Sequence, residues 1–189
     1  MIETLITSKT RIKILLKFFL NSSSSSYLRG LESEFGESSN AIRVELNRLE
    51  KAGLLSTSLQ GNKKMFCANT RHPLFKDIHN ILLKYIGFDQ IIDKIINLLG
   101  DVKLVFVVGD FAKGIDSQII DLLFVGDKID RGNLLRLTEK SEKMIKRKIR
   151  SLIYTTAEFN KEFPEKNRNG EMLLLWKEEG HRINGNKKQ

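Results

Sequence analysis

The chain has 189 residues, of which 41% are hydrophobic and 29% are charged, and its formal net charge is +9. This length suits one ordinary domain or two small ones, and the excess of basic residues suits a polyanionic partner. A single cysteine, Cys67, excludes a disulfide framework and a thiolate metal cluster, and we interpret it as a small buried hydrophobic residue. No apolar run is long enough to cross a bilayer and no signal-peptide pattern opens the sequence, so we expect a cytoplasmic protein without a metal or other cofactor.

The first predicted elements are two helices. Residues 8–21 carry apolar side chains at the spacing of one helix face, namely Ile12, Leu15, Leu16 and Phe19. The five serines at 22–26 end this helix, because their hydroxyl groups compete for backbone hydrogen bonds. A second, short helix follows, with Gly36 as its C-cap and an inner face made of Leu28, Leu31 and Phe35.

A third helix is predicted from the segment "SNAIRVELNRLEKAG". Ser38 or Ser39 can cap its N-terminus, Gly53 ends it, and its buried stripe consists of Ile42, Leu46 and Leu49. Ser39, Arg43 and Asn47 recur every four residues on a different face. Helix, short helix, glycine turn and helix form a helix-turn-helix, whose last helix enters the major groove of DNA. Arginine and asparagine can make paired hydrogen bonds with guanine and adenine edges.

A two-stranded hairpin is predicted after this helix. Alternating residues from Leu55 to Leu59 lead into the turn Gln60-Gly61-Asn62, and residues 64–68 return. Lys63 and Lys64 lie beside the turn, where they could meet backbone phosphates. Helix-turn-helix and hairpin together predict a winged helix over residues 1–72, with DNA-binding residues Ser38, Ser39, Asn40, Arg43, Asn47, Lys63 and Lys64.

This part of the sequence resembles the winged-helix domain of ArsR-like bacterial and archaeal transcriptional regulators. The resemblance rests on "VELNRLEKAGL" at Val44–Leu54, the turn glycine Gly61 and "HPLF" at His72–Phe75. The cysteine and histidine cluster of the metal-sensing members is absent, so the resemblance does not imply metal sensing.

Pro73 breaks the chain before a predicted connecting helix at residues 73–87. Its apolar residues are Leu74, Ile78, Ile81, Leu82 and Tyr85, and we expect this helix, with the first helix, to supply the surface of a homodimer. A further helix is predicted up to Gly100 from Ile91, Ile92, Ile95, Ile96 and Leu99.

From residue 102 the pattern changes from helical to β. "VKLVFVV" and "IIDLLFVG" are runs typical of strands buried on both faces. A polar helix at about residues 131–146 and a third strand at 149–155 follow, and Thr155 with Glu158 predicts a capping box for one more helix. We interpret Trp176 as a core or interface residue. The fold class is therefore α+β, with a winged helix followed by a small mixed α/β domain at residues 88–189.

The second domain resembles the minimal nucleotidyltransferase domain of the DNA polymerase beta superfamily, in which a "GSxARG" turn holds nucleotide phosphates and "SDIDLLV" supplies metal ligands. In "GDFAKGIDSQIIDLL", the turn residues Gly109 and Ala112 to Gly114 match the first motif, and Asp121 matches the second carboxylate of the second motif. Asp110 replaces the serine, Ile119 replaces the first metal carboxylate, and Arg150 lies near the place of the third. The candidate nucleotide-binding residues implied by the resemblance are Gly109, Asp110, Lys113, Gly114, Asp121 and Arg150.

Two magnesium ions cannot be held by one carboxylate, so the resemblance implies that no catalytic residues or metal ligands remain. We expect a DNA-binding transcriptional regulator whose second domain serves sensing or assembly, with double-stranded DNA and a second copy of the chain as partners and a nucleotide or small molecule as a candidate effector. An active nucleotidyltransferase targeted by its winged helix is the alternative, with Asp110 or Asp116 as substitute ligands, and a toxin–antitoxin partner is compatible with the fold. The basic run Lys143, Lys146, Arg147, Lys148 and Arg150 is either a solvated helix face or a second phosphate-facing patch.

Overall fold

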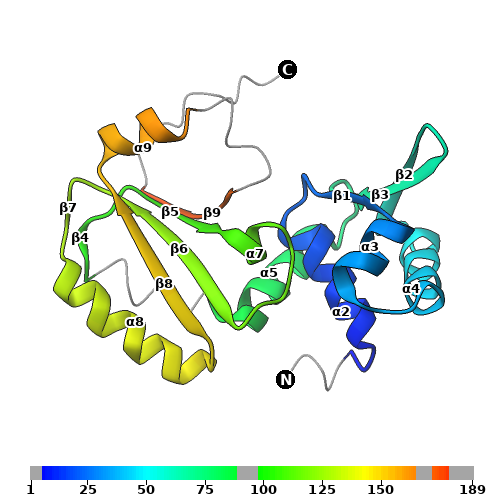
Figure 1. The fold of residues 1–189 in the computed structure, drawn as a ribbon, viewed down its shortest axis with the longest axis horizontal. Coiled ribbons are helices and arrows are strands. Elements are labelled where there is room, and N and C mark those ends of the chain that lie inside the picture. Colours follow the sequence, from blue (N-terminus) through cyan, green and yellow to red (C-terminus); the bar gives the residue numbers. More distant parts are fainter. Residues whose placement is uncertain (1–5, 89–97, 165–171, 179–189) are drawn as a thin grey trace.

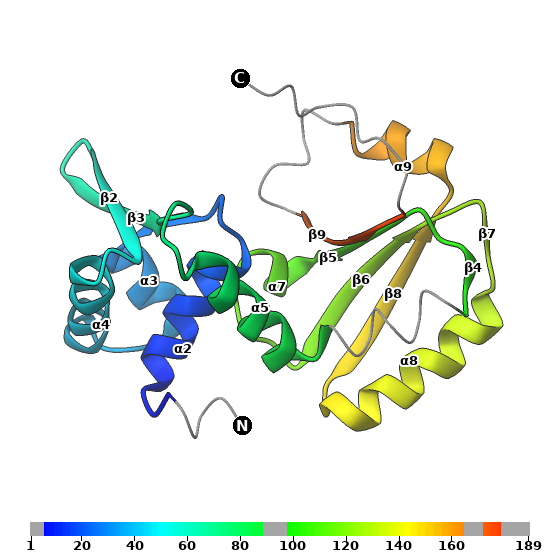
Figure 2. The same ribbon diagram turned by 180° about the vertical axis from the view of Figure 1, so that it is seen from behind.

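The computed structural model of the chain describes residues 6–88, 98–164 and 172–178, and has a mixed α and β fold (Figure 1). A helical part with a small sheet is followed by a four-stranded sheet. Helices flank this larger sheet, as Figure 2 shows from behind. In the described residues no helix is long and apolar enough to cross a membrane.

The predicted first helix consists of two different helical segments. α2 is an α-helix over Lys9–Leu15, and its N-cap Ser8 accepts a hydrogen bond from the backbone N–H of Arg11 at 3.2 Å. It continues without a break into a π-helix, η1, over Leu16–Leu20, in which every residue is buried. π-helical segments are rare and frequently lie at functional sites.

The wing is a three-stranded sheet, and the predicted two-stranded hairpin was incomplete. β2 (Leu55–Gln60) and β3 (Lys63–Ala68) pair around Gly61 as expected, but β1 (Ser25–Tyr27) pairs with the other edge of β3. The last two serines of the run and Tyr27 therefore belong to a strand. Cys67 is only half-buried, and its thiol donates to the carbonyl of Ser56 at 3.8 Å, so its prediction as a buried hydrophobic residue was wrong.

The second and third predicted helices are confirmed. α3 spans Leu28–Phe35 and ends at Gly36, which has the left-handed φ of 62° that its C-cap position favours. α4 spans Ser39–Lys51, and its N-cap is Ser38, whose side chain accepts from the backbone N–H of Ala41. The predicted inner faces are buried at Leu31, Ile42, Leu46 and Leu49.

The connecting helix α5 (Phe75–Ile86) packs against η1. Phe75 stacks on Phe19 with ring centroids 5.5 Å apart, and the ring Nδ1 of His79 lies 2.8 Å from the carbonyl oxygen of Phe19. The helix predicted from Ile91 to Leu99 lies mostly outside the described residues.

The large sheet has the strand order β8-β6-β5-β9. β5 runs antiparallel to β6 and β9, whereas β6 and β8 are parallel. The sequence predicted the central strands well but missed β9 around Trp176 and a two-stranded pair, β4 with β7. The bounds are β4 Gly100–Asp101, β5 Leu104–Val108, β6 Ile119–Val125, β7 Lys128–Ile129, β8 Lys148–Tyr154 and β9 Met172–Lys177.

Helices cover both faces of this sheet (Figure 1). α8 (Arg131–Ile145) covers one face, and α9 (Thr156–Glu162) lies against the other with Phe159 stacked on Phe106. The predicted capping box of Thr155 and Glu158 is present. A one-turn helix, α7 (Gly109–Ala112), follows β5 and lies between the sheet and the winged helix in both views.

One continuous cluster of buried apolar side chains runs from the winged helix into the sheet. Phe88 and Phe111 meet edge to face within it, with ring centroids 5.8 Å apart. The apolar residues of the first helix, among them Ile14, Leu16 and Phe18, are buried in this cluster. The expectation that the first helix supplies a dimer surface was therefore wrong, because its own chain already covers it.

Candidate functional sites

α4 is fixed to α2 by an ion pair between the partly exposed Arg11 and the buried Glu45. Arg11 Nε donates to a carboxylate oxygen of Glu45 at 2.8 Å, and the guanidinium of Arg48 lies 3.5 Å from the other oxygen. Burial opposes ionisation of Glu45, but hydrogen bonds from Arg11 and Ser8 outweigh it and hold the pKa of this carboxyl below its ordinary value. The inner face of α4 is thereby held in one orientation, which also fixes its outer face.

The outer face of α4 borders a groove of about 660 Å³ between this helix and the strands β1 and β3. Arg43 and Asn47 lie exposed on its helix side. Four of the seven predicted DNA-binding residues thus line one groove, namely Arg43, Asn47, Lys63 and Lys64. Ser38, Ser39 and Asn40 lie outside it, and Asn40 is exposed. The polar residues that line the groove are Arg29, Arg43, Asn47, Asn62, Lys63 and Lys64.

The two wing lysines differ in their freedom to bind a ligand. Lys64 pairs with Glu50 at 2.7 Å, and its hydrogen bond keeps the pKa of Glu50 below the ordinary value. Lys63 forms no ion pair within the described residues, and its ammonium lies 4.4 Å from the centre of the Tyr27 ring. Lys63 is therefore the more available cation for a phosphate group.

Ser38 and Ser39 have structural roles at the turn. Ser38 caps α4, and the Ser39 hydroxyl donates to Glu32 at 2.5 Å. Both side chains already stabilise the turn between α3 and α4, so Arg43 and Asn47 are the residues of the predicted face whose side chains line the groove.

Arg29 lines the groove, although no pattern in the sequence singled it out. Its place beside the wing depends on the pairing of Tyr27 with Met65 across β1 and β3. Nothing in a run of serines distinguishes this short strand from a loop, so no sequence signal could have identified Arg29.

The second candidate site is at the C-terminal end of β5 and the N-terminal end of β6, where Asp121 and Arg150 form a two-pronged ion pair. The two guanidinium nitrogens of Arg150 donate to the two carboxylate oxygens at 2.5 and 2.8 Å. Hydrogen bonding with Asp121 raises the pKa of Arg150 further above its ordinary value, and the charge of Asp110 adds to this effect. Both carboxylate oxygens are thus engaged by a cation that belongs to the protein.

Gly109 fits closely against this pair. Its φ is +68°, and a Cβ built on it would lie only 2.6 Å from Oδ2 of Asp121. Neighbouring Ile119 is partly exposed on the same strand as Asp121 and carries no ligand atom. Asp116, a candidate substitute ligand, is paired with Arg147 at 2.7 Å. In the described part of the chain no group of three or more histidine, cysteine or acidic residues could hold a metal ion.

The rest of the glycine turn is docked on the winged helix. The amide nitrogen of Asn21 donates to the carbonyl of Ala112 at 2.7 Å, and Lys17 Nζ donates to the carbonyl of Lys113 at 2.9 Å. Lys17 also pairs with Glu34 of α3 at 2.9 Å, so it joins three segments. A Cβ on Gly114 would lie 2.3 Å from Cα of Lys17, which means that backbone touches backbone here.

The six candidate nucleotide-binding residues therefore do not form one site. Gly109, Asp121 and Arg150 lie together, with Asp110 close enough to affect Arg150. Gly114 faces the first helix, and the side chain of Lys113 is exposed. The turn that would cradle phosphates in a nucleotidyltransferase holds the winged helix in this protein.

Comparison with known proteins adds no family to these observations. A scan against models of protein families gives no match, and a search of curated proteins finds no significant similarity. The two resemblances read from the sequence motifs therefore remain hypotheses, and the case for a function rests on the geometry of the groove and of the glycine turn.

Proposed function

We propose that the protein is a DNA-binding transcriptional regulator that reads duplex DNA with α4 and the wing. The observation that carries this proposal is the groove in which Arg43 and Asn47 of the helix share one concavity with Arg29 and Lys63. Donors that can read bases and cations that can neutralise phosphates are thus combined on one surface, as DNA recognition requires.

Each of these residues has a separate part in the proposed complex. Arg43 presents a fork of donors suited to guanine, and Asn47 has the donor and acceptor that adenine requires. Lys63 and Arg29 contact phosphates, which gives affinity without sequence preference. Glu50 does not repel the DNA strongly, because Lys64 neutralises it.

The C-terminal sheet is proposed to serve sensing or assembly, not catalysis. Arg150 already engages both oxygens of Asp121, and the adjacent Ile119 cannot bind a metal ion. The alternative of an active nucleotidyltransferase has no observation in its favour among the described residues.

A second copy of the chain is the proposed protein partner. Two large apolar side chains are exposed along α5, the N-cap residue Leu74 at 53% and Ile81 at 51%, whereas Leu82 and Ile86 are buried. A symmetric pair would match two half-sites in DNA, and sedimentation equilibrium measures whether it forms.

The DNA proposal is tested with an operator selected from random duplexes. Arg43→Ala should weaken binding to it by about 1–3 kcal/mol and relax the preference at one base pair. Lys51→Ala is the matched control, because Lys51 is an exposed cation of the same helix outside the groove. Equal affinities of wild type and Arg43→Ala in fluorescence anisotropy would show that the recognition face is assigned wrongly.

A further inference from the structure

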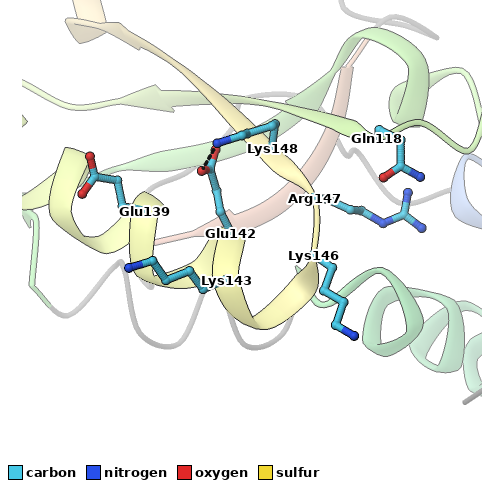
Figure 3. Close-up of a pocket in the computed structure, with 7 residues that line it drawn as sticks. All are labelled: Gln118, Glu139, Glu142, Lys143, Lys146, Arg147 and Lys148. Carbon is cyan, nitrogen blue, oxygen red and sulfur yellow. Dashed lines mark hydrogen bonds and ion pairs between the residues drawn. The ribbon is translucent and has the colours of Figure 1, made fainter.

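A basic cleft lies between the C-terminal end of α8 and the segment that leads into β6, and it shares no residue with the DNA-facing groove. Its volume of about 540 Å³ is in the range of small-molecule sites. Figure 3 shows that Gln118 and Arg147 lie together at one end of the cleft, with Glu139 and Lys143 at the other. The cations that line it are Lys143, Lys146, Arg147 and Lys148.

One acidic residue of the cleft is already satisfied. Glu142 accepts hydrogen bonds from the backbone N–H of Ile149 at 2.8 Å and from Lys148 Nζ at 2.9 Å. These bonds, the one from Ile149 most, hold the pKa of Glu142 below its ordinary value. Lys148 is paired with Glu142, and Arg147 with Asp116. Within the described residues Lys143 and Lys146 make no ion pair, and they outnumber Glu139, the remaining acidic residue of the lining, so the cleft keeps one net positive charge.

Arg147 is held in place before any ligand arrives. Its guanidinium donates to the carboxylate of Asp116 at 2.7 Å and to the carbonyl of Ser117, and it lies 5.2 Å from the centre of the Phe111 ring. A guanidinium fixed in this way loses little entropy when it binds an anion.

Lys146 has a backbone conformation that is unfavourable for a lysine. Its φ is +56°, and it is the one residue other than glycine with a positive φ in the described part of the chain. The position is the left-handed C-cap of α8, where glycine or asparagine is more stable. Strain of this kind is concentrated at ligand-binding positions, where function maintains it against stability.

We propose that this cleft binds a small polyanion of the phosphate type, either the phosphate chain of a nucleotide or free polyphosphate. Two unpaired ammonium groups and a fixed guanidinium around one concavity favour a ligand with more than one negative charge. One terminal nitrogen of Arg147 is bonded to Asp116 and Ser117, and its remaining nitrogens can donate to phosphate oxygens. The ammonium groups of Lys143 and Lys146 act as point charges, and the Gln118 amide donates one further bond. The site involves no residue of the proposed DNA contact, so its test is independent of that function.

The experiment is calorimetric titration of the intact protein at low ionic strength with tripolyphosphate and, separately, with ATP. Binding of either anion is expected, and tighter binding of ATP identifies a nucleotide, whereas tighter binding of tripolyphosphate identifies the free polyanion. Lys146→Gly should lower the affinity for the anion about tenfold, as expected for the loss of one charge-assisted contact. The melting temperature of this variant should rise, because glycine favours the left-handed conformation. A variant that is more stable but binds less cannot be explained by misfolding.

Lys140→Ala is the matched control, since Lys140 is an exposed cation of α8 outside the cleft. It should leave anion affinity within about twofold of wild type, because screening limits the influence of distant surface charges. An equal loss in both variants would reduce the effect to general attraction by a basic protein and overturn the proposal. Absence of heat at millimolar anion would overturn it as well. So would a Lys146→Gly variant that binds both anions like wild type but binds duplex DNA more weakly.

Discussion

Replacing Gly114 by alanine tests whether the glycine turn is the point at which the two parts of the protein are joined. Gly114 has a φ of +75°, and the added Cβ would lie 2.3 Å from Cα and 2.7 Å from the carbonyl oxygen of Lys17. Both atoms belong to the backbone of a buried helical segment, so neither can move aside as a side chain could. The loop must withdraw from the helix or η1 must shift.

Two contributions give the expected loss of stability. A left-handed conformation is unfavourable for alanine by about 1–2 kcal/mol. Forcing one extra carbon into a packed contact adds about 1–3 kcal/mol. The free energy of unfolding should therefore fall by about 2–5 kcal/mol, the sum of both terms.

Gly36→Ala separates these contributions, because Gly36 has a similar φ of +62° and nothing within 4 Å of its added Cβ. It should lose only the conformational part, about 1–2 kcal/mol. Urea unfolding followed by circular dichroism measures both variants. If both variants lose the same stability, the close packing of Gly114 against the backbone of Lys17 does not contribute, and the proposed contact between the two parts of the protein is refuted.

The remaining predictions concern the two ion pairs that fix the sites. Glu45→Gln should reduce stability at neutral pH by about 1.5 kcal/mol, the lower end for hydrogen bonds to charged groups, because Arg11 keeps access to water. The pKa of Glu45 is lower in the folded protein, so the stabilisation by this carboxylate is present above pH 4.5 and disappears as the pH falls through the pKa of the folded state. The urea midpoints at pH 6 and pH 3 should therefore differ less in the variant than in wild type. Asp121→Ala should leave operator affinity unchanged, and neither it nor wild type should transfer labelled nucleotides with magnesium or manganese to any acceptor, including the protein itself. Transfer by wild type that disappears in Asp121→Ala would restore the alternative of an active enzyme.

The sequence predicted those elements whose signals are local. Ser38, Gly36 and the Thr155–Glu158 capping box define helix ends through neighbouring residues, and the apolar runs of β5 and β6 require burial on two faces. The pairing of Asp121 with Arg150 was also within reach, because it follows from parallel alignment of β6 and β8.

The features that the sequence did not reveal depend on distant partners. Ser25–Tyr27 becomes a strand because β3 offers it an unpaired edge, and Met172–Lys177 becomes one because β5 does. The π-helical turns of η1 differ from α-helix by a single step in hydrogen bonding, which apolar periodicity does not record. Docking of Gly114 on Lys17 joins segments whose motifs were interpreted separately.

The bond from Lys17 to the carbonyl of Lys113 spans 96 residues, and the bond from Asn21 to Ala112 spans 91. During synthesis the winged helix therefore emerges long before the surface that completes it. Until β5 and the glycine turn have been made, Lys17 has Glu34 as its ionic partner, and the apolar side of η1 lacks part of its cover. Contacts of such high sequence separation slow folding and expose apolar surface meanwhile. The N-terminal part therefore completes its packing only after residues 104–125 have been synthesised.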